Sequence, residues 1–148
     1  MNLANEMKTE TSPLISVVIP TYNHAEFLKV AISSVLAQIY QNFEIVIVDN
    51  CSNDHTNEVV DSFNDDRIHL HKINNNGIIA ASRNLGVDHA KGDWIAYLDS
   101  DDYWYTTRLQ CLVDSMDGDL KYDVISTDEY KTNNLTGEKT KVIYGPVE

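Results

Sequence analysis

The sequence is poor in cysteine, glycine and proline, with two, six and three of these residues among 148. Cys51 and Cys111 form no CxxC motif, and two thiols are too few for a disulfide framework, so we expect reduced thiols. The glycines form neither G-x-G-x-x-G nor G-x-x-x-x-G-K-[ST], which argues against dinucleotide-binding and P-loop folds. No apolar run approaches the roughly 18 residues of a membrane span.

Positive charge is also scarce, because 11 basic residues stand against 23 acidic ones and the formal net charge is −12. Such a chain repels DNA and anionic lipid, so we expect no nucleic-acid partner. A phosphorylated ligand would need a metal cation or a locally positive site. Residues 1–12 are polar and lack the apolar segment of a secretion signal, so we expect a flexible leader before a single domain at residues 13–148.

Short apolar runs alternate with segments of helical periodicity along the rest of the chain. Residues 14–19 are apolar and rich in β-branched side chains, which predicts a strand buried on both faces and ended by Pro20. The alternation predicts an α/β fold, doubly wound, with a mostly parallel sheet and helices on both faces. The predicted strands are 14–19, 43–48, 67–73 and 94–98, the helices are 25–38, 54–63, 78–90 and 106–116, and two further strands are 122–126 and 141–144.

Polar clusters follow three of the predicted strands, at residues 20–23, 49–54 and 99–104. Because the carboxyl ends of parallel strands meet at one edge of an open α/β sheet, we expect the three clusters to surround one ligand site. Asp49 is placed to accept a hydrogen bond from the imide N–H of a base, or to bond its own turn. Arg83 is a candidate cation for a phosphate, or a solvated helical arginine.

The most acidic cluster is Asp99-Ser100-Asp101-Asp102, directly after a predicted strand. Two unit charges about 4 Å apart repel by about 4 kcal/mol at an effective dielectric of about 20, so protons, solvent or a divalent cation must relieve the repulsion. Oxygen ligands favour Mg²⁺ or Mn²⁺. In an extended segment Asp99 and Asp101 would point the same way. The alternative is a solvated acidic turn in which Asp102 or Thr106 caps the next helix.

Five histidines add a weaker signal. His69 and His71 share one face of a predicted strand, so a metal pair is conceivable there, but a solvent-facing edge is favoured because no third ligand is evident. We expect His24, His55 and His89 to be surface residues.

Four ordered segments carry specific motifs: ISVVIPTYN at 15–23, IVDNCSND at 47–54, ASRNLG at 81–86 and GDWIAYLDSDD at 92–102. In this order and spacing they strongly resemble the N-terminal, donor-binding part of the family-2 glycosyltransferases, which have the GT-A (nucleotide-diphospho-sugar transferase) fold. The resemblance covers about residues 14–116. It implies an inverting, metal-dependent transfer of a sugar from a nucleotide-diphosphate donor, a UDP-sugar in our prediction, to an acceptor hydroxyl.

The resemblance also implies roles for individual residues. The segment with Pro20, Thr21 and Tyr22 lines the nucleoside pocket, and the position of Asp49 binds the base, commonly uracil. Arg83 lies near the diphosphate, Asp99 and Ser100 lie at the donor, and Asp101 ligates Mn²⁺ or Mg²⁺, with Asp99 and Asp102 as further candidate ligands. The family suggests a saccharide or glycolipid acceptor and polysaccharide biosynthesis in the cytoplasm of a bacterium, at the inner face of its membrane, with peripheral membrane association. It does not predict the oligomeric state.

The sequence departs from the family pattern in three respects. Cys51 stands where the family usually has glycine, so the turn after Asp49 lacks the residue that adopts positive φ most easily. Thr106 stands where the family often has proline. The general base of the family is an acidic residue well downstream of the metal motif, and we find no counterpart for it, since Asp128 and Glu129 come too early. The catalytic residue is therefore unassigned, and residues 13–148 lack much of the acceptor-binding half.

Two other functions are considered. The chain could be a truncated or catalytically incomplete module that binds a nucleotide sugar without transferring it. A phospho-receiver domain shares the doubly wound topology and a metal-binding acidic cluster. It would need an acidic pair directly after the first strand, where this chain has Pro20-Thr21-Tyr22-Asn23, so this function is disfavoured.

Overall fold

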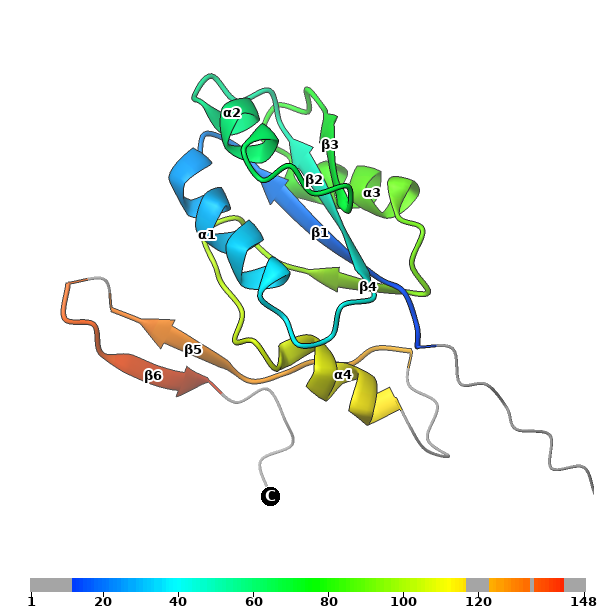
Figure 1. Cartoon of the computed structure of the whole chain (residues 1–148). Coiled ribbons are helices and arrows are strands. Elements are labelled where there is room, and N and C mark those ends of the chain that lie inside the picture. Colours follow the sequence, from blue (N-terminus) through cyan, green and yellow to red (C-terminus); the bar gives the residue numbers. More distant parts are fainter. Residues whose placement is uncertain (1–11, 117–122, 134, 143–148) are drawn as a thin grey trace, which may run out of the picture. The chain divides into compact units, whose positions relative to one another are not determined.

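The computed structural model describes residues 12–116, 123–133 and 135–142, and the chain divides into two compact units (Figure 1). The first unit runs to Val113 and the second begins at Asp114, so the boundary falls within helix α4 (Arg108–Met116). The predicted leader lies almost wholly outside the described residues. A single domain over residues 13–148 remains a prediction.

The first unit contains a four-stranded parallel sheet with the strand order β3-β2-β1-β4. Helices α1 and α2 lie on one face of this sheet and α3 lies on the other (Figure 1). This arrangement confirms the predicted doubly wound α/β fold, and all four strands and four helices predicted between residues 14 and 116 are present with shifted ends. Their bounds are β1 (Ile15–Thr21), α1 (Ala25–Leu36), β2 (Phe43–Asp49), α2 (Thr56–Asp61), β3 (Ile68–Lys72), α3 (Ile79–His89), β4 (Trp94–Tyr97) and α4.

Alternate side chains of β1 and β2 pack on opposite faces of the sheet, as the period of two requires. Val17, Ile19 and Ile45 belong to the core cluster that also holds the α1 residues Leu28, Ile32 and Val35. Val18 points to the other face, where a Cβ added to Gly86 of α3 would lie 2.3 Å from Val18 Cγ1. A glycine is therefore needed at this position for α3 to pack closely on β1.

Pro20 does not end the first strand, contrary to the sequence prediction. β1 continues to Thr21, and Pro20 pairs in register with Val48 of β2. The Val18 carbonyl accepts a hydrogen bond from Leu98 N–H on the β4 side, and Pro20, two residues on, faces the same side. Pro20 has no N–H to donate there, and the pairing with β4 ends at Val18 and Tyr97, whereas the pairing with β2 continues to Thr21.

The second unit contains an antiparallel hairpin of β5 (Glu129–Thr132) and β6 (Lys139–Val142). The predicted strand at 122–126 is wrong for residues 123–126, which are in no strand, and residue 122 lies outside the described residues. Val124 is 83% exposed, so its apolar side chain finds no buried face to join. The prediction at 141–144 overlaps the end of β6, with residues 143 and 144 outside the described part.

Candidate functional site

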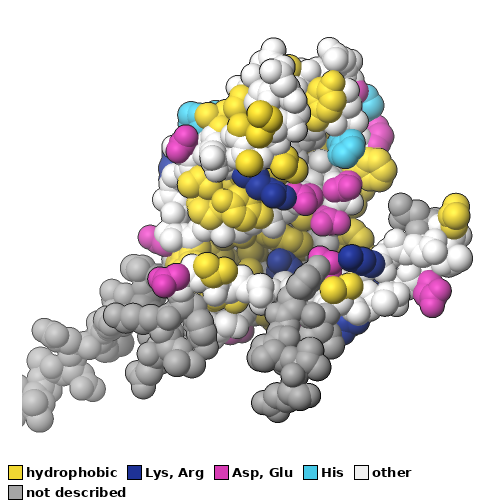
Figure 2. Space-filling model, turned by 180° about the vertical axis from the view of Figure 1, so that it is seen from behind, with side chains coloured by type: hydrophobic (Ala, Val, Ile, Leu, Met, Phe, Trp, Pro, Cys, Tyr) yellow, Lys and Arg dark blue, Asp and Glu magenta, His cyan; other side chains and the backbone are white. Residues whose placement is uncertain are grey.

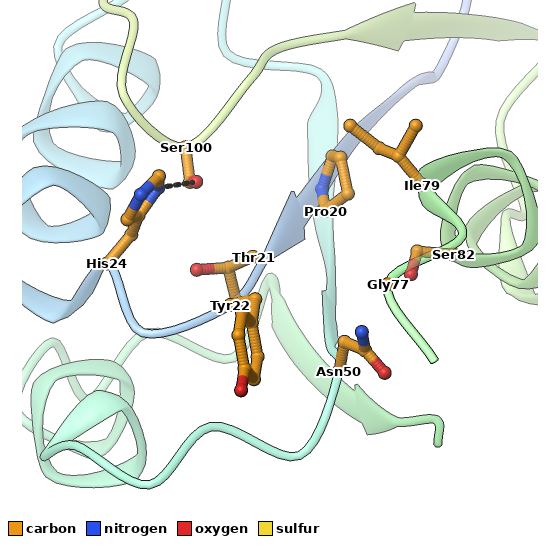
Figure 3. A pocket seen from close by; sticks show the side chains of 9 residues that line it. All are labelled: Pro20, Thr21, Tyr22, His24, Asn50, Gly77, Ile79, Ser82 and Ser100. Carbon is orange, nitrogen blue, oxygen red and sulfur yellow. Dashed lines mark hydrogen bonds between the residues drawn. The ribbon is translucent and has the colours of Figure 1, made fainter. Parts of the chain in front are cut away.

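A cavity of about 260 Å³ opens at the carboxyl ends of β1 and β2, beside the first turn of α3. The loops that follow β1, β2 and β4 all contribute to its wall, as the polar clusters predicted. It lies next to the point between β1 and β4 where the strand order reverses, which is where ligands bind in open α/β sheets. Its lining residues are Pro20, Thr21, Tyr22, His24, Asn50, Gly77, Ile79, Ser82 and Ser100 (Figure 3).

Asp49 ends β2 with its side chain fully buried, and Thr21 is its register partner in β1. Asp49 Oδ1 accepts hydrogen bonds from the backbone N–H and the hydroxyl of Ser52, at 2.9 and 2.5 Å. Asp49 Oδ2 is buried without a hydrogen-bond partner, and so is Thr21 Oγ1. Asp49 does not line the cavity, but its neighbours Thr21 and Asn50 do. A buried acceptor without a donor is costly, so these atoms mark a place where a ligand could supply one.

Thr21 and Tyr22, two of the residues predicted to contact the nucleoside, differ in how far they are exposed. Tyr22 is 50% exposed at the rim of the cavity, whereas Thr21 is 4% exposed in its wall. An exposed ring beside a cavity offers an apolar face to a planar ligand.

The loops after β1 and β2 are tied together by side-chain hydrogen bonds. Asn23, which has a φ of 53°, donates its N–H to Ser52 Oγ at 2.8 Å and accepts from Asn53 N–H at 2.7 Å. Asp54 Oδ2 accepts from Ala25 N–H at 3.0 Å, and Asp54 Oδ1 accepts from the Thr56 hydroxyl at 2.5 Å. Burial would raise the pKa of Asp54, but these hydrogen bonds hold it below its usual value.

A third wall is formed by the loop before α3. Asn75 N–H donates to Asn50 Oδ1 at 3.1 Å, and Asn75 Nδ2 donates to Ser82 Oγ at 2.8 Å. Gly77, with a φ of 82°, donates its N–H to Asn75 Oδ1 at 3.1 Å. Asn75 thereby fixes the start of α3 against the loop that follows β2.

The acidic segment after β4 is a turn and not the extended segment that the sequence analysis considered. Asp102 N–H donates to the Asp99 carbonyl at 3.0 Å, which closes the turn over residues 99–102. Ser100 is 5% exposed and lines the cavity, where its hydroxyl lies 3.0 Å from His24 Nδ1. The side chains of Asp101 and Asp102 are exposed.

Arg83 reaches from α3 to the acidic turn. Its Nη2 lies 2.6 Å from Asp99 Oδ1, and its guanidinium carbon lies 5.7 Å from the centre of the Tyr97 ring. Arg83 Nε is buried without a hydrogen-bond partner. On the face opposite to that of Figure 1, acidic side chains gather beside a basic one, with hydrophobic side chains around them (Figure 2). Arg83 is thus no freely solvated arginine, and it brings positive charge to the carboxylate turn.

The chemistry of the donor set suits a hard divalent cation. Within the described residues no group of three or more histidine, cysteine, aspartate or glutamate side chains is placed to hold a metal. Mg²⁺ sites in phosphoryl- and nucleotide-binding proteins need only one or two carboxylates, because the phosphates of the substrate complete the coordination. Asp101, with Asp99 and Asp102 beside it in the same turn, meets that requirement.

Several lining residues were not identified from the sequence, namely His24, Gly77, Ile79 and Ser82, whereas Asn50 belongs to the predicted cluster at 49–54. His24 was expected at the surface but is half-buried in the cavity wall. His69 and His71 do not form a metal pair: His69 Nε2 lies 3.6 Å from Glu44 Oε2, and the His71 ring stacks on His89 at 3.8 Å. The position of His24 directly after the cluster at 20–23 was the available signal for this residue.

Residues 16–145 match the profile of Glycosyl transferase family 2, and the chain belongs to this family. It is 38% identical over 132 residues to the UDP-Glc:alpha-D-GlcNAc-diphosphoundecaprenol beta-1,3-glucosyltransferase WfaP of Escherichia coli, covering 89% of this chain and 50% of WfaP. The resemblance to family-2 glycosyltransferases is thereby confirmed.

Solved structures support the GT-A fold. S. aureus TarS 1-349 in complex with UDP-GlcNAc aligns with a TM-score of 0.63 at 29% identity, over 70% of this chain and 31% of that one. The mannosyltransferase PcManGT from Pyrobaculum calidifontis, solved with GDP-Man and Mn²⁺, aligns with a TM-score of 0.67 over 74% of this chain and 34% of that one; at 24% identity this likeness concerns the fold alone.

The chain spans about half or less of the length of the curated relatives it matches. No helix among its described residues is long and apolar enough to cross a membrane.

Proposed function

We propose that this chain is the donor-binding part of a glycosyltransferase that moves a sugar from a UDP-sugar to an acceptor hydroxyl, with inversion and with the help of a divalent metal. Family membership supports the reaction class. The names of WfaP, which uses UDP-Glc, and of TarS, solved with UDP-GlcNAc, support a uridine diphosphate donor. WfaP acts on a diphosphoundecaprenol-linked sugar, which supports a glycolipid or saccharide acceptor. We further propose that the reaction takes place at the inner face of a bacterial membrane.

The observation that carries the proposal is the buried, unpartnered Oδ2 of Asp49 beside the cavity. The imide N–H of uracil is a donor of the required kind, and its binding would satisfy this oxygen. Thr21 and Tyr22 would then contact the nucleoside, Tyr22 through the face of its exposed ring, while Pro20 would line the wall beside them.

The diphosphate would lie beside Arg83 and the acidic turn, which are in contact with each other. Arg83 would meet its negative charge, Asp99 and Ser100 would contact the ribose and the donor sugar, and Asp101 would hold Mn²⁺ or Mg²⁺, with Asp99 and Asp102 as further ligands. The metal, when bound, would neutralise the charge that develops on the leaving diphosphate. The general base that takes the proton of the acceptor is unassigned in this proposal.

A second candidate is a module that binds the nucleotide sugar without completing transfer. The short span of this chain relative to its relatives favours it. Incubation with UDP-glucose or UDP-GlcNAc, Mn²⁺ and a panel of saccharide and polyprenyl-diphosphate acceptors separates the two, since only the transferase forms a glycosylated product.

Calorimetric titration of UDP and of GDP, each with and without Mn²⁺, tests the donor assignment. We expect UDP to bind more tightly than GDP, and more tightly with Mn²⁺ than without. In Asp101→Ala the Mn²⁺-dependent gain in UDP affinity should be abolished. Asp123→Ala, which removes an exposed carboxylate of the second unit, is the matched control and should behave as the parent. Equal UDP affinity of the parent with and without metal would contradict the metal assignment.

A further inference from the structure

The loops that leave the neighbouring strands β1 and β4 are joined by one side-chain contact. His24 Nδ1 lies 3.0 Å from Ser100 Oγ, although the two residues are 76 positions apart, and both line the cavity (Figure 3). The contact spans the point where the strand order reverses. It therefore links the side of the site proposed for the nucleoside to the side proposed for the metal.

On the nucleoside side, His24 is held by a continuous series of contacts that begins at Asp49. Asp49 Oδ1 accepts from the Ser52 hydroxyl, and Ser52 Oγ accepts from Asn23 N–H, the residue before His24. The His24 carbonyl accepts from Leu28 N–H at 2.8 Å in α1, and its ring packs edge-on against Phe27 at 5.6 Å. The ring of His24 is thus fixed relative to the carboxylate at the end of β2.

On the metal side, Ser100 stands between Asp99 and Asp101 in the turn that Asp102 N–H closes. It is 5% exposed, whereas Asp101 is exposed, so Ser100 anchors the turn in the protein while the carboxylate projects outward. A shift of Ser100 would displace both flanking carboxylates, because the backbone joins them directly.

Helix capping does not explain the side chain of His24. His24 occupies the N-cap position of α1, where a side chain commonly accepts a hydrogen bond from an N–H of the first turn. His24 makes no such bond, and Ala25 N–H is instead satisfied by Asp54 Oδ2 from the loop after β2. Its imidazole therefore hydrogen-bonds to Ser100 and not to an N–H of its own helix.

We propose that His24 is a positioning residue that couples the nucleoside side of the site to the metal-binding turn through its bond to Ser100. This inference rests on the proposed function. His24 holds Ser100 so that Asp99 and Asp101 face the diphosphate, and a shift of the loop after β1 on nucleoside binding would be passed to that turn through this bond. By linkage, metal binding strengthens nucleotide binding by the same factor by which the nucleotide strengthens metal binding.

A double-mutant cycle with His24→Ala, Ser100→Ala and the double variant tests this coupling. For each protein, the dissociation constants of UDP with and without Mn²⁺ and of uridine are measured, and the readout is the ratio of the two UDP constants. We expect each single variant to reduce that ratio about 5-fold, the size of effect of one neutral hydrogen bond, and the double variant to reduce it no further. Uridine, which has no phosphate to share with the metal, should bind equally well with and without Mn²⁺ in the parent and in every variant.

The neighbouring loop supplies a matched control. His55→Ala removes a histidine that pairs with Glu26 at the surface and does not line the cavity, and it should leave the ratio unchanged. If one single variant fails to fold, as judged by thermal unfolding, the other removes the same bond from its opposite end. Additive effects of the two substitutions, or an unchanged ratio in either of them, would overturn the inference. A parent whose UDP affinity does not respond to Mn²⁺ would instead contradict the proposed function.

Discussion

Strand β2 buries a carboxylate near each of its ends, and the two are treated differently. Glu44, near the amino end, is 5% exposed; its Oε1 accepts from the Ser16 hydroxyl and from Lys91 N–H, both at 2.6 Å, and its Oε2 lies 3.6 Å from His69 Nε2. Asp49, at the carboxyl end, is fully buried, and one of its oxygens has no partner. The two carboxyl groups lie on one strand and are similarly buried, yet both oxygens of Glu44 have polar partners and only one oxygen of Asp49 does.

The difference separates structure from function. Buried polar groups in folded proteins are hydrogen-bonded in the great majority, so a satisfied carboxylate such as Glu44 needs no ligand to explain it. An unpartnered oxygen lowers stability unless something else binds there. The two ends of β2 should therefore respond oppositely to substitution, with stability lost at the amino end and ligand affinity lost at the carboxyl end.

The largest expected effect is at Glu44. Glu44→Ala leaves the Ser16 hydroxyl and Lys91 N–H without their acceptor in a buried place, and each stranded donor costs about 1–3 kcal/mol. We expect the free energy of unfolding, measured with urea, to fall by about 3 kcal/mol. The affinity for UDP should not change, because Glu44 is not among the residues that line the cavity.

The pH dependence of stability gives an independent check on Glu44. Burial would raise its pKa, but the hydrogen bonds from Ser16 and Lys91 hold it below the model-peptide value of 4.5. A carboxyl with a lowered pKa in the folded state stabilises the protein above pH 4.5, and this contribution is lost as the pH falls through the folded-state pKa. The parent should lose more stability on acidification below pH 4.5 than Glu44→Ala does; parallel curves would contradict the assignment.

The next largest effect is expected at Asp49, in affinity. Asp49→Asn keeps an oxygen that can accept from Ser52, so the free energy of unfolding should change by less than about 1 kcal/mol. The amide NH₂ that replaces Oδ2 cannot accept from an imide N–H. Since hydrogen bonds to charged groups contribute about 1.5–3 kcal/mol, we expect the dissociation constants of UDP and of uridine to rise about 30-fold. An Asp49→Asn protein that binds UDP as the parent does would remove the base-binding role.

The sequence predicted the frame of the site but not its internal contacts. Apolar runs and helical periodicity located the strands, and the rule that carboxyl ends share one edge placed Thr21, Asp49 and Ser100 in one region. The bond between His24 and Ser100 joins residues 76 positions apart, which no local pattern contains. Residues 99–102 form a turn, closed by the hydrogen bond from Asp102 N–H to the Asp99 carbonyl, and not the extended segment considered from the sequence. The burial of Ser100 within this turn is a tertiary feature that the sequence pattern does not contain.

The continuation of β1 past Pro20 is another feature that the sequence alone did not predict. The missing N–H of Pro20 affects only the side of β1 that faces β4, where pairing ends at Val18, and the pairing with β2 continues through Thr21. The lengths of neighbouring strands are set by tertiary packing, so the end of β1 could not be read from residue types alone.

The smallest expected effect concerns backbone strain at the functional edge. Cys51 adopts a φ of 56°, in the left-handed region, where the resembled family usually has glycine. A non-glycine residue in this conformation costs roughly 1–2 kcal/mol, and replacing it with glycine relieves that cost. Glycine also raises the entropy of the unfolded chain, which offsets roughly half of the stability gained. We therefore expect Cys51→Gly to raise the free energy of unfolding by about 0.5–1 kcal/mol, measured by urea denaturation under reducing conditions.

The same substitution at the second cysteine, Cys111, is the control for Cys51→Gly. Cys111 is also exposed but lies within α4, where φ is negative and glycine costs about 1 kcal/mol relative to a good helix former. Cys111→Gly should therefore lower stability, so the same chemical change is expected to have opposite signs at the two positions. If both variants were destabilised, the turn after Asp49 would relax to accommodate cysteine, and the carboxyl end of β2 would carry less strain than its backbone angles indicate.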